Sequence, residues 1–172
     1  MTGVDPIGVR HTAAADWALL KGLRLAALRD APTAFGVSHA QALADPDSDW
    51  QRRAAGTGPS TFFLAFEHDE AIGMAAAVAV DDRRMGLIAM WVSPPARGRQ
   101  AGAGGGVADR LVDAVKARAA DAGASELILE VAPSNRRAVA LYARHGFVFQ
   151  SHVEYLASHP HIALRRMAWP VE

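Results

Sequence analysis

Residues 87–107, LIAMWVSPPARGRQAGAGGGV, decide how the fold is interpreted. The first six are apolar at consecutive positions, which is typical of a central strand covered on both faces. A glycine-rich loop follows, and from there Val107, Leu111 and Val115 recur at helical spacing. Glycines let a backbone approach an anion closely, and the unpaired N–H groups at a helix start attract it. The stretch therefore predicts a phosphate site between a buried strand and a helix.

Two arginines and the exclusion of other motifs sharpen this interpretation. Arg97 and Arg99 carry guanidinium forks suited to phosphate oxygens. A P-loop needs Lys-Ser or Lys-Thr, and neither dipeptide occurs in the chain. A dinucleotide fold places its glycines after the first strand of a parallel series, whereas here they follow the fourth strand candidate. A merely flexible loop is the remaining alternative.

Hydrophobic periodicity extends the pattern in both directions. It predicts an α/β (α+β) domain over residues 1–172, with a mixed, mostly antiparallel sheet of about seven strands and about four helices. The expected strands are residues 7–10, 61–67, 71–80, 87–92, 127–131, 147–156 and 162–169. The expected helices are residues 17–29, 39–53 with a break near Pro46, 107–122 and 135–145, and a turn is expected at residues 158–161.

Composition excludes several classes of function. Eighteen basic and eighteen acidic residues balance, so nucleic acid and anionic membranes are not expected partners. The chain has no cysteine, which rules out disulfides, thiolate metal sites and an enzyme thioester intermediate. The first twenty residues lack the pattern of a signal peptide, and no apolar run approaches a membrane span. We therefore expect a cytoplasmic protein.

Two blocks of residues together resemble the GNAT superfamily of acetyl-coenzyme A-dependent N-acetyltransferases. The first is the lead-in at residues 91–99 with the glycine loop, where the family signature is [QR]-x-x-G-x-[GA]. The second is Leu-Glu-Val-Ala-Pro-Ser-Asn at residues 129–135, followed by Ala138, by Leu-Tyr at 141–142 and by Gly-Phe at 146–147. The blocks occur in the family's order, and the pair is far more specific than either alone.

The resemblance implies acetyl-coenzyme A as cosubstrate and central fourth and fifth strands that splay apart around it. The loop is longer than the family's usual spacing: the signature fits from Arg99, but we favour residues 104–108 as the helix start. Which amides contact the pyrophosphate therefore stays open. The predicted coenzyme contacts are Met90, Trp91, Val92, Arg97, Gly98, Arg99, Gly102, Gly104, Gly105, Gly106, Val107, Ala108, Asn135, Ala138 and Tyr142.

The resemblance also assigns roles in amine acylation. Tyr142 is the expected general acid that protonates the departing thiolate, with an ordinary half-buried aromatic as the alternative. Asn135 is compatible with both coenzyme contact and a helix N-cap. The candidate bases are Glu130 and Glu67, each at the end of a predicted strand, with a solvated or paired carboxylate as the alternative for both.

The acceptor is expected to bind between residues 30–50 and the turn at 158–161. Phe35, Trp50 and His159 are the candidate substrate residues, although Phe35 and Trp50 equally suit anchors of a loop to the core. His159 and His161 have the spacing of a metal pair, but no third ligand is evident, so no metal is predicted.

These features predict an N-acetyltransferase that acylates a small-molecule or peptide amine directly. The alternatives are transfer from a longer acyl-coenzyme A, and a catalytically weak acyl-coenzyme A binding or sensing module. The resemblance is also compatible with a homodimer.

Overall fold

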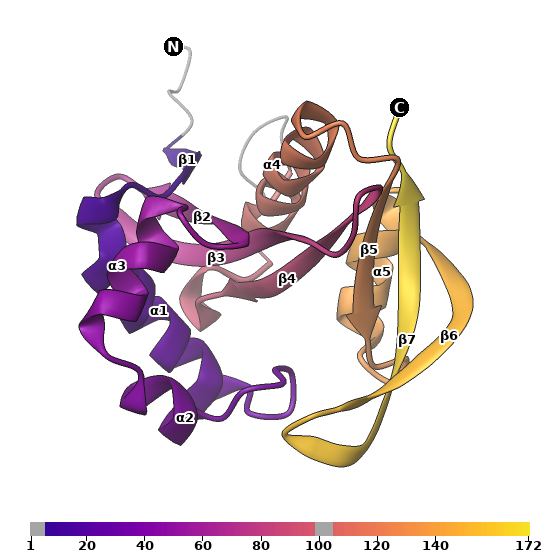
Figure 1. Cartoon of the computed structure of the whole chain (residues 1–172), viewed down its shortest axis with the longest axis horizontal. Coiled ribbons are helices and arrows are strands. Elements are labelled where there is room, and N and C mark those ends of the chain that lie inside the picture. The colour runs from indigo at the N-terminus through magenta and orange to yellow at the C-terminus, as the bar shows by residue number, and fades with distance from the viewer. Residues whose placement is uncertain (1–5, 99–104) are drawn as a thin grey trace.

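A seven-stranded mixed sheet forms the centre of the computed structural model, which describes residues 6–98 and 105–172 (Figure 1). The strands run in the order β1-β2-β3-β4-β5-β7-β6, and every neighbouring pair is antiparallel except β4 and β5. Their bounds are β1 Ile7–His11, β2 Ser60–Glu67, β3 Glu70–Ala79, β4 Arg84–Val92, β5 Glu126–Val131, β6 Val148–Leu156 and β7 His159–Pro170. The predicted fold class is confirmed.

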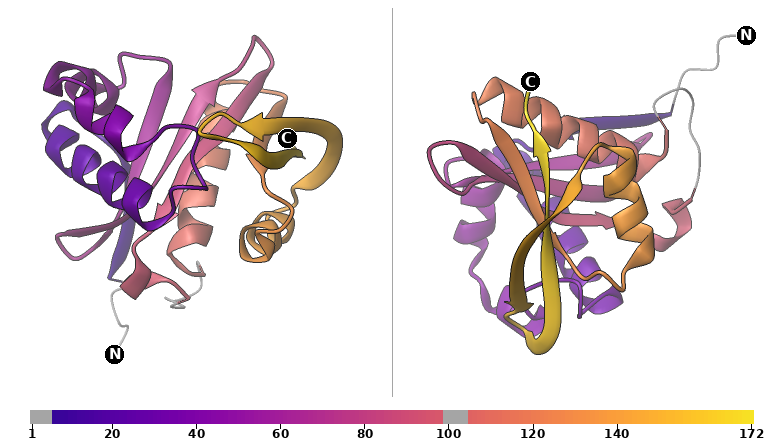
Figure 2. Two further views of the ribbon diagram at one scale, coloured as in Figure 1. Left: turned by 90° about the horizontal axis from the view of Figure 1, so that it is seen from below. Right: turned by 90° about the vertical axis from the view of Figure 1, so that its right-hand side faces the viewer.

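Five α-helices occur within the described residues and cover both faces of the sheet (Figure 2). Side chains from α1, α2 and α3 share one hydrophobic cluster, and side chains from α4 and α5 share the other. The bounds are α1 Trp17–Asp30, α2 His39–Ala44, α3 Asp47–Ala55, α4 Val107–Asp121 and α5 Arg136–Arg144. The expected break near Pro46 is confirmed and separates α2 from α3, because Pro46 has extended backbone and precedes the first residue of α3.

The helix after the glycine loop forms as its pattern predicts. Val107, Leu111, Val112, Val115 and Ala119 of α4 are all buried against the sheet. The helix is followed by Gly123 with φ +72°, a left-handed position at which glycine carries no steric penalty.

Strands β4 and β5 diverge, as the resemblance implies. They pair only from Arg84 to Gly86 opposite Glu126 to Ile128. Beyond this point, β4 contains a bulge, where its register with β3 shifts and Ala89 has φ +57°. A bulge bends its strand and increases the local twist. Residues 87–92 of β4 therefore turn away from residues 129–131 of β5, and we refer to these two stretches as the divergent segment.

The C-terminal hairpin reaches across to the loop between α1 and α2 (Figure 1). Ser158 Oγ donates a hydrogen bond of 2.6 Å to the carbonyl oxygen of Phe35. The two segments that were expected to form the acceptor site thus lie in contact. The expected turn at residues 158–161 is shorter, because His159 and His161 already belong to β7.

Candidate active site

The divergent segment leaves apolar side chains uncovered in the middle of the sheet. Ile88 is 41% exposed although it lies in a central strand. Met90 is partly buried against the α4–α5 side, and Val92 is buried there. Ile88 is therefore an exposed apolar side chain on the part of a central strand that does not pair with β5, a position that suits an apolar ligand segment such as a pantetheine arm.

Helix α5 places Tyr142 beside the divergent segment. The side chain is 7% exposed and meets the Phe147 ring edge to face, with centroids 5.8 Å apart. Burial raises the pKa of its phenol, so the hydroxyl stays protonated throughout the usual pH range. At the start of the helix, Asn135 Oδ1 accepts from the backbone N–H of Ala138 at 3.2 Å. The N-cap role of Asn135 is confirmed, and its coenzyme contact stays a prediction.

The start of α4 carries an acidic side chain close to its amides. The Gly106 N–H donates to Asp109 Oδ2 at 3.0 Å, so one predicted phosphate-binding amide is engaged by a carboxylate. Desolvation opposes ionisation of Asp109, but bonds from His145, Arg144 and the Gly106 amide prevail and lower its pKa. Gly105, Val107 and Ala108 complete this end of the loop, with Gly105 at φ +77°. Arg99, Gly102 and Gly104 lie outside the described residues.

Arg97 and Trp91 are fastened to α1 through a carboxylate that the sequence did not single out. Asp30 Oδ2 accepts from Trp91 Nε1 at 2.9 Å and also contacts Arg97 Nη2. Arg97 Nε donates to the carbonyl oxygen of Val92 at 2.8 Å. Arg97 first and Trp91 second lower the pKa of Asp30, so this anion joins the end of α1 to the end of β4. A phosphate-binding role for Arg97 stays a prediction.

A second cation approaches the glycine loop from α5. Nη2 of Arg137 lies 3.3 Å from the position that a Cβ would take on Gly98, which has φ +73°. Sequence reasoning did not select Arg137, because no motif distinguishes it from the neighbouring Arg136. Its nearness to the loop appears only once α5 is packed beside the turn that follows β4.

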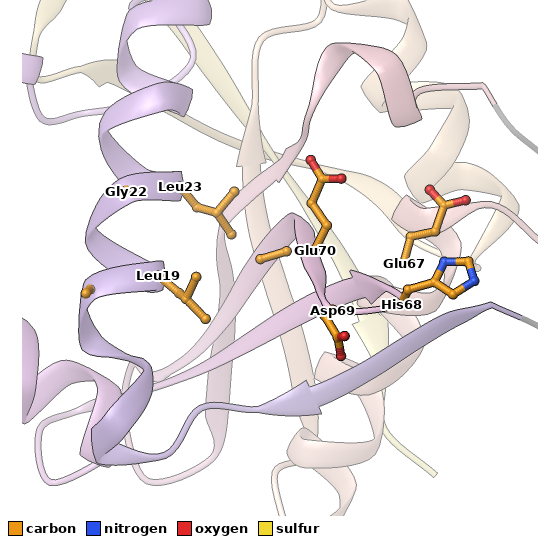
Figure 3. Close-up of a pocket in the computed structure, with 9 residues that line it drawn as sticks. Leu19, Gly22, Leu23, Glu67, His68, Asp69 and Glu70 are labelled. Atoms are coloured by element: carbon orange, nitrogen blue, oxygen red, sulfur yellow. The ribbon is translucent and has the colours of Figure 1, made fainter.

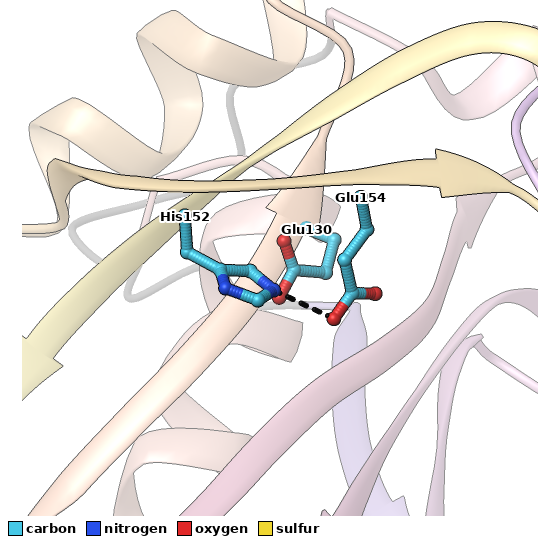
Figure 4. A group of neighbouring side chains, drawn as sticks. All are labelled: Glu130, His152 and Glu154. Carbon is cyan, nitrogen blue, oxygen red and sulfur yellow. Dashed lines mark hydrogen bonds and ion pairs between the residues drawn. The ribbon is translucent and has the colours of Figure 1, made fainter.

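Glu130 lies in a charged network on the face of the sheet opposite Tyr142. Its neighbours Leu129 and Val131 belong to the α4–α5 cluster, and side chains alternate along a strand. Glu130 Oε1 accepts from Arg166 Nε at 2.7 Å, and its Oε2 is buried with no hydrogen-bond partner among the described residues. Glu154 and His152 complete the group (Figure 4).

Glu67 lies elsewhere, in an open pocket of about 810 Å³ (Figure 3). The pocket is formed by Leu19 and Leu23 of α1 and by the β2–β3 turn, which also supplies Asp69 and Glu70. Strands β3 and β4 separate β2 from β5 in the sheet. The structure therefore does not bring the two candidate bases together, and Glu130 is the one on a strand of the divergent segment.

The candidate substrate residues differ in accessibility. Trp50 is 2% exposed in the core between α1 and α3, with Arg53 stacked 4.6 Å from its ring centroid. Phe35 is also buried there, and the Arg24 guanidinium lies 4.8 Å from the centroid of its ring. Both positions match the anchoring alternative. His159 lies at the start of β7, where its Nδ1 is 2.9 Å from Ser158 Oγ.

Comparison with known proteins identifies a family. The family model described as acetyltransferase (GNAT) family matches residues 23–147. No curated protein matches the sequence. Across the described residues, no helix is long and apolar enough to cross a membrane.

Solved structures agree in fold at low sequence identity. RimL, a ribosomal L7/L12 alpha-N-protein acetyltransferase in complex with coenzyme A, has a TM-score of 0.75 and 13% identity, covering 98% of this chain and 96% of its own. YncA, a putative acetyltransferase from Salmonella typhimurium with its cofactor acetyl-CoA, has a TM-score of 0.73 and 15% identity, covering 96% and 94%. A GNAT-family acetyltransferase from Streptococcus pneumoniae has a TM-score of 0.73 and 19% identity, covering 96% and 99%.

Proposed function

The chain belongs to the acetyltransferase (GNAT) family, and we propose that it transfers an acetyl group from acetyl-coenzyme A directly to a primary amine. The divergence of β4 from β5 carries the proposal, because it leaves residues 87–92 of β4 and 129–131 of β5 unpaired with each other, with a phenol on one face of the sheet and a carboxylate network on the other. Two of the structures similar in fold contain coenzyme A or acetyl-CoA, which supports this choice of cosubstrate.

The residues around the glycine loop suit the phosphates of the coenzyme. Gly105, Val107 and Ala108 lie where α4 begins, and helix N-termini favour anions. Arg137 adds a guanidinium beside Gly98. The Asp109 carboxylate is paired with the Arg144 guanidinium at 2.8 Å, which offsets its negative charge. We assign the pantetheine arm to the divergent segment, beside Met90 and Val92.

Tyr142 is the proposed general acid. Its raised pKa keeps the proton on the hydroxyl, and the same burial makes that proton harder to give up. We therefore expect Tyr142 to supply a hydrogen bond that strengthens as charge develops on the departing sulfur, with the proton moving as the carbon–sulfur bond breaks.

The acceptor is proposed to enter from the face opposite Tyr142. The β6–β7 hairpin and the loop after α1 border that face, and the hydrogen bond from Ser158 to Phe35 joins them. Both a small amine and the amine of a peptide are compatible with this arrangement.

Calorimetric titration with acetyl-coenzyme A, followed by an assay of thiol release with a panel of amines, tests the proposal. Micromolar binding and amine-dependent thiol release are expected, with weaker binding of longer acyl forms. Binding without transfer would favour the acyl-coenzyme A binding module instead. Absence of binding by every form would refute the proposal.

A further inference from the structure

Three strands bring four charged or titratable side chains onto one face of the sheet beside the divergent segment. Strand β7 lies between β5 and β6, and its Arg166 is opposite Glu130 of β5 in the register. On β6, His152 and Glu154 are two residues apart, a spacing that places side chains on the same face of a strand. Figure 4 shows Glu130, His152 and Glu154 pointing into the same region.

The contacts within this group give its members different roles. Arg166 donates to Glu130 through Nε at 2.7 Å and lies 3.5 Å from Glu154 through Nη2. His152 Nε2 is 2.8 Å from Glu154 Oε1. A carboxylate only accepts, so the proton of the neutral imidazole belongs on Nε2, and Nδ1 carries a lone pair. The His152 side chain is 44% exposed, so the ring is accessible to a ligand.

A cation site is a poorer description of the same group. One donor atom of each of Glu130, His152 and Glu154 lies within 4.8 Å of the others, which is close enough for shared ligation. The Arg166 guanidinium, however, already contacts both carboxylates and supplies their positive charge. A divalent ion would have to displace it or lie against it.

We propose that His152 is the catalytic residue that takes the proton from the acceptor amine, that Glu154 positions its ring, and that Glu130 is held by Arg166 as a fixed charge. This inference rests on the proposed acetyl transfer. An imidazole has an ordinary pKa of about 6.5 and a glutamate about 4.3, and a general base works best when its pKa is near the operating pH. One Glu130 oxygen is also engaged by the guanidinium.

The protons and bonds balance with this assignment. The acceptor ammonium gives one proton to His152 Nδ1, which releases it to solvent. The amine lone pair then attacks the thioester carbonyl carbon, so a carbon–nitrogen bond forms as the carbon–sulfur bond breaks. The sulfur takes a proton from the Tyr142 hydroxyl. The second proton lost by nitrogen then passes through water to the Tyr142 phenolate and restores its hydroxyl.

The matched variants His152→Gln and His11→Gln test the assignment. His11 is exposed on β1, at the opposite edge of the sheet. Two acceptor probes are compared: ethanolamine, which is protonated at neutral pH, and methoxyamine, which is not. His152→Gln is expected to lower kcat/KM for ethanolamine about 100-fold at pH 7, the scale of a lost general base. The loss should be much smaller for methoxyamine, and His11→Gln should match the wild type with both.

The pH profile separates catalysis from a structural effect. In the wild type, the pH profile of kcat/KM for ethanolamine should contain two contributions, one from the protein base in its surrounding of Glu154, Glu130 and Arg166 and one from ionisation of ethanolamine itself. Glu154→Gln removes the anion beside the imidazole, so the contribution of the base should change. In His152→Gln only the contribution of ethanolamine should remain, while binding of acetyl-coenzyme A stays unchanged by calorimetry.

The outcomes distinguish this inference from the proposed function. Wild-type transfer that persists at full rate and with the same pH profile in His152→Gln would overturn the base and leave the transferase intact. An equal loss for both probes would also overturn it, because a structural fault does not depend on the protonation of the acceptor. Wild-type binding of acetyl-coenzyme A without thiol release to any amine of the panel would refute the transferase, and with it this base.

Discussion

Replacement of Gly73 by alanine is expected to strain both ends of the glycine loop. Gly73 is buried in β3 opposite Val92 of β4. A Cβ at this position would lie 3.1 Å from the carbonyl oxygen of Trp91, 3.2 Å from Leu111 Cδ1 and 3.3 Å from Val107 Cγ1. The first of these atoms is backbone, and Val107 begins α4. The added methyl group therefore meets β4 and α4 together, and these neighbours must give by a few tenths of an ångström to admit it.

The size of the destabilisation by Gly73→Ala follows from two opposing contributions. Overpacking of a core costs about 1–3 kcal/mol, and the loss of glycine from the unfolded chain returns about 0.4–1 kcal/mol. A net destabilisation of about 1–2 kcal/mol should lower Tm by about 2–8 °C in a domain of this size. If about 1 kcal/mol of the strain persists at the loop ends, the Kd for acetyl-coenzyme A should rise about fivefold.

Thermal unfolding followed by circular dichroism and calorimetric titration measure the two effects. Gly22→Ala is the matched control, because Gly22 lies within α1 and a Cβ there meets nothing within 4 Å. That change should stabilise the protein by about 0.5–1 kcal/mol through helix propensity alone. A Tm for Gly73→Ala equal to or above that of the wild type would show that β4 and α4 yield freely, and the reasoning would be wrong.

Three further outcomes are expected. Tyr142→Phe should lower kcat by about 10- to 1000-fold with coenzyme affinity nearly unchanged, as measured by steady-state kinetics and calorimetry; full activity across the pH range would exclude the acid role. Ser158→Ala removes the bond to the Phe35 carbonyl and should raise KM for the amine more than it lowers kcat, whereas an unchanged KM would separate this contact from the acceptor site. Asp30 and Asp109 have lowered pKa values in the folded state, so the stability that they contribute is present above about pH 4 and is lost as the pH falls below it. The Tm measured between pH 3 and 6 should therefore fall less steeply with decreasing pH in Asp30→Asn and Asp109→Asn than in the wild type. Equal slopes would contradict the assignment.

Most of the fold was accessible from the sequence because its elements have strong local signals. The spacing of Val107, Leu111 and Val115 predicts α4, and all three residues are buried. The apolar run in residues 87–92 predicts a central strand, and β4 is one. The start of β7 was missed because Pro160 between two histidines has the composition of a turn, while the actual turn is at Ala157 and Ser158.

The elements that carry the candidate site were predictable from the sequence, but the pairings of its side chains were not. The motifs select α5, the start of α4 and the end of β5, which the fold brings around the divergent segment. The partner of Glu130 is 36 residues away on another strand, and the partner of Arg97 is 67 residues away on α1. Such pairs depend on the register of strands and on helix packing, and neither has a local signal. The sequence places Arg97 beside the glycine loop and so predicts a phosphate contact, but it gives no sign of the contacts with Asp30 and β4 that the structure describes.

The divergence of β4 from β5 allows one strand to serve both halves of the proposed reaction. Along β5, Leu129 and Val131 point towards the face where Tyr142 lies, and Glu130 points towards the face of His152 and Arg166. A closed sheet would separate these faces completely, since main-chain pairing would fill the space between the strands. The left-handed conformation of Ala89 and the bulge around it interrupt that pairing on β4. In the proposed reaction, the first proton of the acceptor ammonium and the proton for the sulfur are handled by groups on opposite faces, which keeps the base away from the acid. We infer that the bulge in β4, more than any single side chain, makes a direct transfer between two bound substrates feasible in this chain.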